Sequence, residues 1–146
     1  AGLADGMLRK AFSGAFAPAV RSGWRSYAVL YTKTHEWIDV DGEKATMGIT
    51  DHAQNELGDV VFVEGTDAGE TLEVGDEAGQ VESVKASSVL YTPVAGTVLE
   101  FNRELEGTPG LLNTDPLGKG WILKFNQVTE VAEDLMTEEE YAKFLE

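Results

Sequence analysis

Short apolar segments alternate along this chain with clusters of turn residues, a pattern typical of many short β-strands. Two β-type segments flank Asp41-Gly42, a pair that suits a two-residue hairpin turn with positive φ. Residues 59–64 are rich in Val and Phe, and residues 88–91 and 97–101 continue the strand pattern. No long helical segment separates these strands. The pattern therefore predicts a mainly β sandwich or small barrel rather than parallel βαβ units.

A short helix is predicted after the first hairpin. Thr50 or Asp51 can cap its N-terminus, and the helix can run to about Leu57. Gly58 can then adopt the left-handed conformation that ends a helix.

The C-terminus carries a second helix signal. Thr137 and Glu140 have the spacing of a capping box, and Tyr141, Phe144 and Leu145 form an i, i+3, i+4 apolar stripe. We expect this stripe to pack the last helix onto the sheet.

Composition narrows the class of protein. A chain of 146 residues suits one domain, and we expect a monomer. It has 26 acidic and 11 basic residues, a net charge of −15, so it should repel nucleic acids and attract partners with basic docking surfaces. No apolar run approaches the roughly 18 residues of a spanning helix, so we expect no membrane association. There is no Cys, so any redox chemistry must come from a cofactor.

The charge is unevenly divided. Residues 1–33 have five basic side chains and one acidic, a net of +4, whereas the remainder has six basic and 25 acidic, a net of −19. Residues 7–27 have the basic, acid-free character of a mitochondrial transit peptide, with a matrix-protease-like site before Ala28. Residues 1–6 are interpreted as an expression remnant. The folded domain is then expected to span residues 31–146.

Lys85 is the side chain that the local sequence displays most clearly. It lies between two segments that favour extended backbone, and the small residues Ala86, Ser87 and Ser88 permit a tight reversal. We therefore expect Lys85 near a hairpin tip, where its amine reaches solvent and another protein's active site.

Nothing in the sequence predicts a self-contained active site. His35 and His52 are the only histidines, and their spacing is not that of a metal site, so we assign no metal ligand and no catalytic residue. The serines beside Lys85 have no nearby general base and are interpreted as turn residues. A hydrolase with Glu36, Asp51 or Asp59 as paired carboxylates is the enzyme alternative.

Several motifs, in order along the chain, resemble those of the glycine cleavage system H protein family. The segment Val81-Glu82-Ser83-Val84-Lys85-Ala86 is similar to that family's lipoyl-attachment sequence. The other matching motifs are His35-Glu36-Trp37, residues 48–54, residues 57–64, Pro93-Val94-Ala95-Gly96, residues 113–116 and Gly120-Trp121. The resemblance runs from about Tyr31 to the C-terminus. It implies the barrel-sandwich hybrid of lipoyl and biotinyl carriers, with short flanking helices and a C-terminal helix.

The resemblance also implies a function. Lipoate would be attached as an amide to Lys85 by a lipoate-attaching enzyme, and the protein would be a carrier rather than a catalyst. It would carry the aminomethyl group of glycine from a pyridoxal-phosphate-dependent glycine decarboxylase (P protein) to a tetrahydrofolate-dependent aminomethyltransferase (T protein). A dihydrolipoyl dehydrogenase (L protein) would reoxidise the dithiol. The expected location is the mitochondrial matrix.

The resemblance places an acid that shelters the loaded arm at Glu36, where a carboxylate could meet the aminomethyl ammonium. In one respect this chain departs from the family. Family members commonly have a Ser-Asp pair where this chain has Ser88-Val89, which implies an altered sheltering pocket.

Two further alternatives are another carrier domain of the same fold and, from a different class, a protein-binding adaptor. Another lipoyl or biotinyl carrier domain would share the fold, but biotinyl sites usually flank the lysine with methionines, whereas here the neighbours are Val84 and Ala86. Lipoyl modules of 2-oxoacid dehydrogenases are shorter and are generally linked to an acyltransferase. An acidic, β-rich adaptor that binds proteins through its surface would leave Lys85 unmodified.

Overall fold

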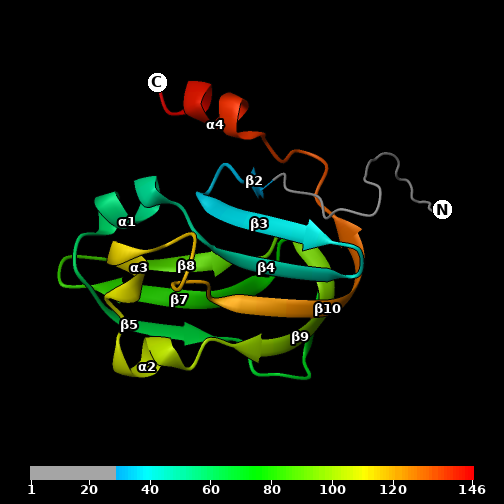
Figure 1. Cartoon of the computed structure of the whole chain (residues 1–146), viewed down its shortest axis with the longest axis horizontal. Coiled ribbons are helices and arrows are strands. Elements are labelled where there is room, and N and C mark those ends of the chain that lie inside the picture. Colours follow the sequence, from blue (N-terminus) through cyan, green and yellow to red (C-terminus); the bar gives the residue numbers. More distant parts are fainter. Residues whose placement is uncertain (1–28) are drawn as a thin grey trace.

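Two antiparallel sheets form most of the part of the chain that the computed structural model describes, residues 29–146 (Figure 1). The predicted transit peptide at 7–27, the remnant at 1–6 and the cleavage site before Ala28 lie outside the described residues. The described strand pairing begins at Val29. No helix within residues 29–146 is long and apolar enough to cross a membrane.

The larger sheet has six strands in the order β2-β3-β4-β10-β9-β6. Its strands are β2 (Val29–Tyr31), β3 (Glu36–Asp41), β4 (Lys44–Ile49), β6 (Thr71–Leu72), β9 (Val94–Phe101) and β10 (Leu123–Val131). The smaller sheet has the order β5-β7-β8, from β5 (Val60–Gly65), β7 (Glu77–Ser83) and β8 (Ser87–Tyr91). The two sheets form an open sandwich, which confirms the mainly β, barrel-sandwich prediction.

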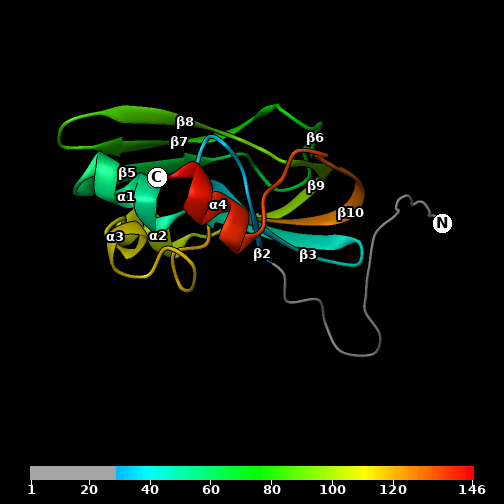
Figure 2. The same ribbon diagram turned by 90° about the horizontal axis from the view of Figure 1, so that it is seen from above.

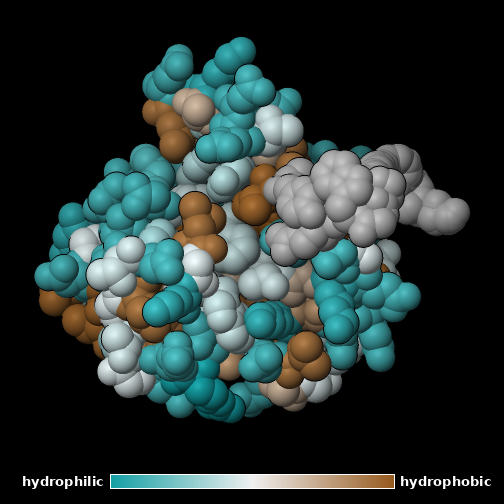
Figure 3. All heavy atoms as spheres, viewed as in Figure 1, coloured by the Kyte–Doolittle hydropathy of each residue, from teal (hydrophilic) through white to brown (hydrophobic). Residues whose placement is uncertain are grey.

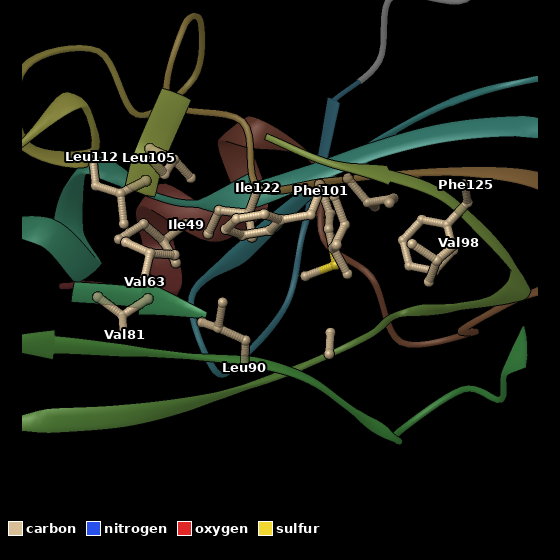
Figure 4. Packing of buried hydrophobic residues seen from close by; sticks show 14 of the residues in the cluster. Ile49, Val63, Val81, Leu90, Val98, Phe101, Leu105, Leu112, Ile122 and Phe125 are labelled. Atoms are coloured by element: carbon tan, nitrogen blue, oxygen red, sulfur yellow. The ribbon is translucent and has the colours of Figure 1, made fainter. Parts of the chain in front are cut away.

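The core lies between the sheets, where each contributes the side chains of its inner face (Figure 4). Val63, Val81 and Leu90 come from the smaller sheet, and Ile49 and Phe125 come from the larger one. In β5 and β7 the residues next to these buried positions face solvent, as the alternation of a strand requires. One face of the smaller sheet is therefore left uncovered.

The first hairpin forms with its turn one residue later than predicted. Asp41 pairs with Lys44, so the two loop residues are Gly42 and Glu43 rather than Asp41 and Gly42. Gly42 has the positive φ, +64°. Gly42 is the first loop residue and the one with a positive φ, so Asp41 can remain in the strand and pair with Lys44.

The helix after this hairpin is α1 (Asp51–Leu57), and both predicted ends are confirmed. The Thr50 hydroxyl accepts a hydrogen bond from the Ala53 N–H at 3.1 Å, as an N-cap does. Gly58 follows with a φ of +78°, although its ψ of −155° differs from that of a left-handed helix.

The last helix, α4 (Glu138–Phe144), has the predicted capping box between Thr137 and Glu140. The predicted stripe is only partly right. Tyr141 is 7% exposed, but Phe144 and Leu145 remain 45% and 37% exposed. The helix is too short to lie along the sheet, so it contacts β2 through one aromatic side chain (Figures 1 and 2).

Two further short helices, α2 (Glu104–Gly107) and α3 (Leu111–Thr114), were not expected from the sequence. Leu105 and Leu112 anchor them in the core. The Asn113 side chain donates to the Gly58 carbonyl at 2.8 Å and accepts from the Val60 N–H at 2.9 Å. This amide thereby fixes the link between α1 and β5.

Candidate functional site

Lys85 lies in the turn that joins β7 to β8, at the end of the molecule beside α1 (Figure 2). The last ladder pair before the turn is Glu82 with Ser87, so the reversal occupies residues 83–86. Ser87 and Ser88, which the sequence suggested as turn residues, already belong to β8. The expected hairpin-tip position of Lys85 matches this geometry, with the turn slightly earlier than the small residues indicated.

The Ser83 side chain organises this turn. Its hydroxyl oxygen accepts from the Ala86 N–H at 3.0 Å and from the Lys85 N–H at 3.3 Å. The Ser83 N–H donates to the Ala86 carbonyl at 2.7 Å, which closes the turn. The reading of Ser83 as a turn serine is therefore correct, and its hydroxyl fixes the backbone from which Lys85 projects.

A further hydrogen bond ties the turn to the neighbouring strand. The Val84 N–H donates to the Asp59 carbonyl at 3.0 Å, just before β5 begins. Val84 itself is 71% exposed, so its backbone ties the turn to the start of β5 while its side chain remains in solvent.

The Lys85 side chain runs over Gly58. A Cβ placed on Gly58 would lie 3.4 Å from the Lys85 Cε and 3.9 Å from its Cδ. The missing side chain at position 58 thus forms a cradle for the methylenes of Lys85. Lys85 is exposed, and within residues 29–146 its amine makes no hydrogen bond or ion pair.

Glu36 is buried at the start of β3, with 1% of its surface exposed. Its Oε1 accepts from the Thr32 hydroxyl at 2.5 Å and the Thr34 hydroxyl at 2.6 Å, and its Oε2 accepts from the Tyr91 N–H at 3.1 Å. Glu36 is therefore not the exposed acid that an open pocket would provide. Its carboxylate joins the turn between β2 and β3 to the end of β8.

Burial raises the pKa of Glu36, and the hydrogen bonds from Thr32, Thr34 and Tyr91 partly offset this by favouring the ionised form. The three donors stabilise a charge that would otherwise be costly inside the protein. Because Glu36 is almost fully buried, a cationic group could reach this carboxylate only if the residues that cover it moved.

Strand β8 connects the two candidate residues. It starts beside the Lys85 turn and ends at Tyr91, whose N–H reaches Glu36. From Ser87 to Tyr91 the strand rises about 13 Å. Val89 lies between these ends, pairs with Gln80 and is 37% exposed, so the residue that departs from the family pattern is on this path.

The two histidines are brought together although 17 positions separate them in sequence. Their ring centroids lie 4.5 Å apart, and His35 has a φ of +73°. The His35 Nδ1 lies 2.7 Å from the Tyr141 hydroxyl oxygen, which is also 2.8 Å from the Thr50 hydroxyl oxygen. This cluster adjoins Glu36 and attaches α4 to the turn that precedes β3.

Other candidate chemistry from the sequence is not assembled here. Within residues 29–146 no three His, Asp or Glu side chains lie close enough to hold a metal ion. Asp51 accepts from the side chains of Gln54 and Asn55 in α1. Asp59 is exposed at the start of β5. Glu36, Asp51 and Asp59, the acids of the hydrolase alternative, therefore lie in three different local environments.

Sequence reasoning missed several residues that shape the site, namely Thr32, Thr34, Gly58, Tyr91 and Tyr141. The two threonines precede Glu36 by four and two positions, the spacing at which a hydroxyl can reach a nearby carboxylate. Gly58 was recognised only as a helix terminator. The contacts of Tyr91 and Tyr141 join distant segments and leave no local signal.

Comparison with known proteins gives a consistent result. The model of the glycine cleavage H-protein family matches residues 29–146. A glycine cleavage system H protein of Herpetosiphon aurantiacus is 49% identical over 119 residues, 82% of this chain and 92% of that protein. One of Rubrobacter xylanophilus is 52% identical over 118 residues, 81% of this chain and 92% of that protein.

A plant relative and a solved structure extend the comparison. Glycine cleavage system H protein 2, mitochondrial, of Arabidopsis thaliana is 50% identical over 118 residues, 80% of this chain and 75% of that protein. The crystal structure of a glycine cleavage system H protein from Mycobacterium marinum matches with a TM-score of 0.74 and 39% identity, over 80% of this chain and 94% of that chain.

Proposed function

This chain belongs to the glycine cleavage H-protein family, and from that premise we propose that Lys85 carries its lipoyl group as an amide. The role of the protein is that of a carrier component of the glycine cleavage system, not of a catalyst. The observation that supports Lys85 most directly is its position in a turn whose backbone Ser83 fixes. The Lys85 side chain is exposed there.

The residues around Lys85 fit such a group. Gly58 leaves room beside the lysine methylenes, and a Cβ there would already be in contact with Cε. The lipoyl group, when bound, would supply the disulfide redox chemistry that a chain without Cys lacks. The chain's own contribution is to hold the attachment point and leave it accessible to enzymes.

Three enzymes are proposed as partners that meet the arm in turn: the pyridoxal-phosphate-dependent glycine decarboxylase, the aminomethyltransferase and dihydrolipoyl dehydrogenase. The aminomethyl group of glycine is the cargo. A tethered arm raises the local concentration of cargo at each active site, which is the physical advantage of a carrier.

Glu36 is proposed to shelter the cargo at the far end of β8. Its buried carboxylate accepts from Thr32 and Thr34 at Oε1 and only from the Tyr91 N–H at Oε2, so Oε2 provides a further acceptor for an ammonium group if the covering residues open. Val89 lies along the path between Lys85 and Glu36 and would offer the arm an apolar contact in place of an acid.

A mitochondrial location is proposed from the composition of residues 7–27 and from a plant relative whose name includes "mitochondrial". Fusion of residues 7–30 to a fluorescent protein tests it in plant or yeast cells. Diffuse fluorescence would contradict this proposal and would leave the carrier function unaffected.

The carrier function is tested with purified protein, a lipoate–protein ligase, ATP and lipoate, followed by intact-mass analysis and peptide mapping. We expect one lipoyl group, on Lys85. Lys85→Arg keeps the charge but offers no amine to acylate, so it should gain no mass. Lys119→Arg, at another exposed lysine, is the matched control and should behave like the wild type. A lipoyl group found on Lys44, Lys119 or Lys124 would refute the assignment.

A further inference from the structure

The uncovered side of the smaller sheet carries exposed apolar side chains around the Lys85 turn. They are Val61, Phe62, Val84 and Val89, with exposed fractions of 52%, 47%, 71% and 37%. We call these four residues the turn-side face. In the view of Figure 1 the smaller sheet lies behind the larger one, so the space-filling view of Figure 3 shows mainly the opposite side of the molecule, with some apolar atoms at its left edge.

Strand pairing places these residues close to one another. Phe62 pairs with Glu82, one residue before Ser83, and Val60 pairs with Ser83 itself. A register irregularity between Val60 and Phe62 turns Val61 outward as well. An aromatic side chain that is half exposed on an open sheet is not needed for the core, which uses Val63 and Val81 on the opposite face.

Acidic side chains border the turn-side face. Asp59 adjoins Val84 through the backbone hydrogen bond, Glu82 pairs with Phe62, and Glu64 pairs with Gln80 beside Val89. Lys85 is the only basic residue in segments 55–65 and 77–91, which contain five acids. The complementary surface is therefore apolar at its centre and basic at its rim.

We propose that the turn-side face is the docking surface of the enzyme that acylates Lys85. This inference rests on the proposed attachment of lipoate at Lys85. The lysine side chain reaches only about 6 Å from its Cα, so an enzyme that modifies the amine must cover the turn and the residues next to it. Enzymes that act later meet a much longer arm and need not approach this face closely.

The lipoyl group is transferred to the Lys85 amine from a lipoyl-adenylate, an acyl-adenylate that the enzyme forms from lipoate and ATP. The Lys85 ammonium first loses a proton, and the free amine attacks the acyl carbonyl carbon. A C–N bond forms, the C–O bond to the phosphate breaks, and AMP leaves with the electron pair of that bond. The nitrogen then gives up a second proton to solvent, which leaves the neutral amide. The turn-side face takes no part in this chemistry, so its contribution should be to binding.

The experiment measures the rate of lipoylation of the whole chain by a purified lipoate–protein ligase with lipoate and ATP, as a function of carrier concentration. Phe62→Ser and Val84→Ser should each raise KM, about tenfold for Phe62, with kcat within twofold of the wild type. Leu99→Ser and Leu117→Ser are matched controls, because these leucines are 43% and 49% exposed on other elements. They should leave KM unchanged.

The acidic rim is tested by Glu82→Gln together with Glu64→Gln. This double variant should raise KM at low ionic strength, and the difference from the wild type should shrink as salt is added. Val84→Ser provides a second test in case Phe62→Ser does not fold, because the exposed Val84 side chain makes few packing contacts.

The outcomes separate this proposal from the carrier function. If the wild type gains its lipoyl group on Lys85 and all variants match it in KM, the docking surface is wrong and the carrier function stands. If the lipoylated Phe62→Ser variant loses affinity only for glycine decarboxylase, the turn-side face binds that enzyme and not the acylating enzyme, and the proposal is wrong. If the wild type gains no lipoyl group at all, both proposals fail.

Discussion

Tyr141 and His35 share a hydrogen bond of 2.7 Å although 106 positions separate them in the sequence. The Tyr141 ring also stacks on Tyr31, with centroids 4.8 Å apart and planes 8° from parallel. The C-terminal helix is thereby attached to the residue that precedes Glu36. The ends of the described chain meet at this point, next to one of the two candidate site residues.

Replacing Tyr141 by Phe should weaken this attachment. The buried hydroxyl contacts both His35 and Thr50. Its loss removes the partner of the His35 Nδ1, while the Thr50 hydroxyl keeps its hydrogen bond from the Ala53 N–H. We expect the free energy of unfolding to fall by about 1–3 kcal/mol, measured by urea denaturation. Tyr91→Phe is the control, since the Tyr91 side chain is 41% exposed, and it should change the stability little. Equal stabilities of the two variants would show that α4 does not depend on this contact.

The pKa of His35 is lowered below its ordinary value of 6.5, first by burial and then by the neighbouring His52, while Glu56 acts in the opposite direction. A lowered folded-state pKa means that the stability contributed by neutral His35 is present above pH 6.5 and is lost as the pH falls through the folded value. His52→Asn should therefore raise the pKa of His35, as measured by NMR of the imidazole protons. An unchanged pKa would exclude an electrostatic effect of His52.

Glu36→Gln tests both roles of the buried carboxylate. Its oxygens accept three hydrogen bonds, and an amide cannot accept all of them without one N–H facing a donor. We expect a loss of about 1–3 kcal/mol in unfolding free energy. If Glu36 also shelters the cargo, protein loaded with the aminomethyl group should release ammonia and formaldehyde faster without partner enzymes. A stability loss with equal release rates would leave Glu36 with a structural role alone.

The pH dependence of this carboxyl has a defined sign. Burial raises its pKa above the ordinary value of 4.5, so the folded protein binds this proton more readily than the unfolded chain. Its contribution to stability is fully present below pH 4.5 and is lost as the pH rises through the folded-state pKa. Carboxyl NMR titration should place the Glu36 pKa above 4.5, and the stability difference between wild type and Glu36→Gln should increase as the pH falls towards that value.

Gly58→Ala should impair the setting of Lys85. The alanine would have to adopt a φ of +78°, and its Cβ would lie 3.4 Å from the Lys85 Cε. Gly42→Ala is a control for backbone strain alone, because its φ is +64° and no atom lies within 4 Å of the added Cβ. Both variants should be destabilised, Gly42→Ala by about 1 kcal/mol and Gly58→Ala by about 1–3 kcal/mol, because the φ of +78° and ψ of −155° at position 58 suit glycine alone. Only Gly58→Ala should also slow the lipoylation of Lys85 in the ligase assay, and equal rates would show that the cradle is dispensable.

Local patterns predicted the parts of the fold that depend on short-range physics. The caps at Thr50 and Thr137, and the turn that displays Lys85, follow from hydrogen bonds between residues a few positions apart. The first turn was placed one residue early because Asp41 and Gly42 suit several loop registers equally well.

The contacts that bury Glu36 could not be predicted in the same way. The donor from Tyr91 lies 55 positions away and is a backbone N–H that any residue would supply. The docking of α4 was predicted as a stripe of three apolar residues, but only Tyr141 is buried, and its hydroxyl makes the hydrogen bond to His35. In both cases the decisive group becomes a neighbour only after the sheets have assembled.

The turn fixed by the Ser83 hydroxyl and the Asp59 carbonyl has a consequence for conformational entropy. Ordering the backbone of one residue costs about 1–2 kcal/mol at 25 °C. If Lys85 lay on a freely moving loop, each partner would have to order that loop at every encounter, and its affinity would fall accordingly. Here the ordering occurs once, during folding. If Lys85 carries the lipoyl group as proposed, the attachment point reaches each enzyme in the same conformation, and brief encounters with several different enzymes can be productive without tight binding.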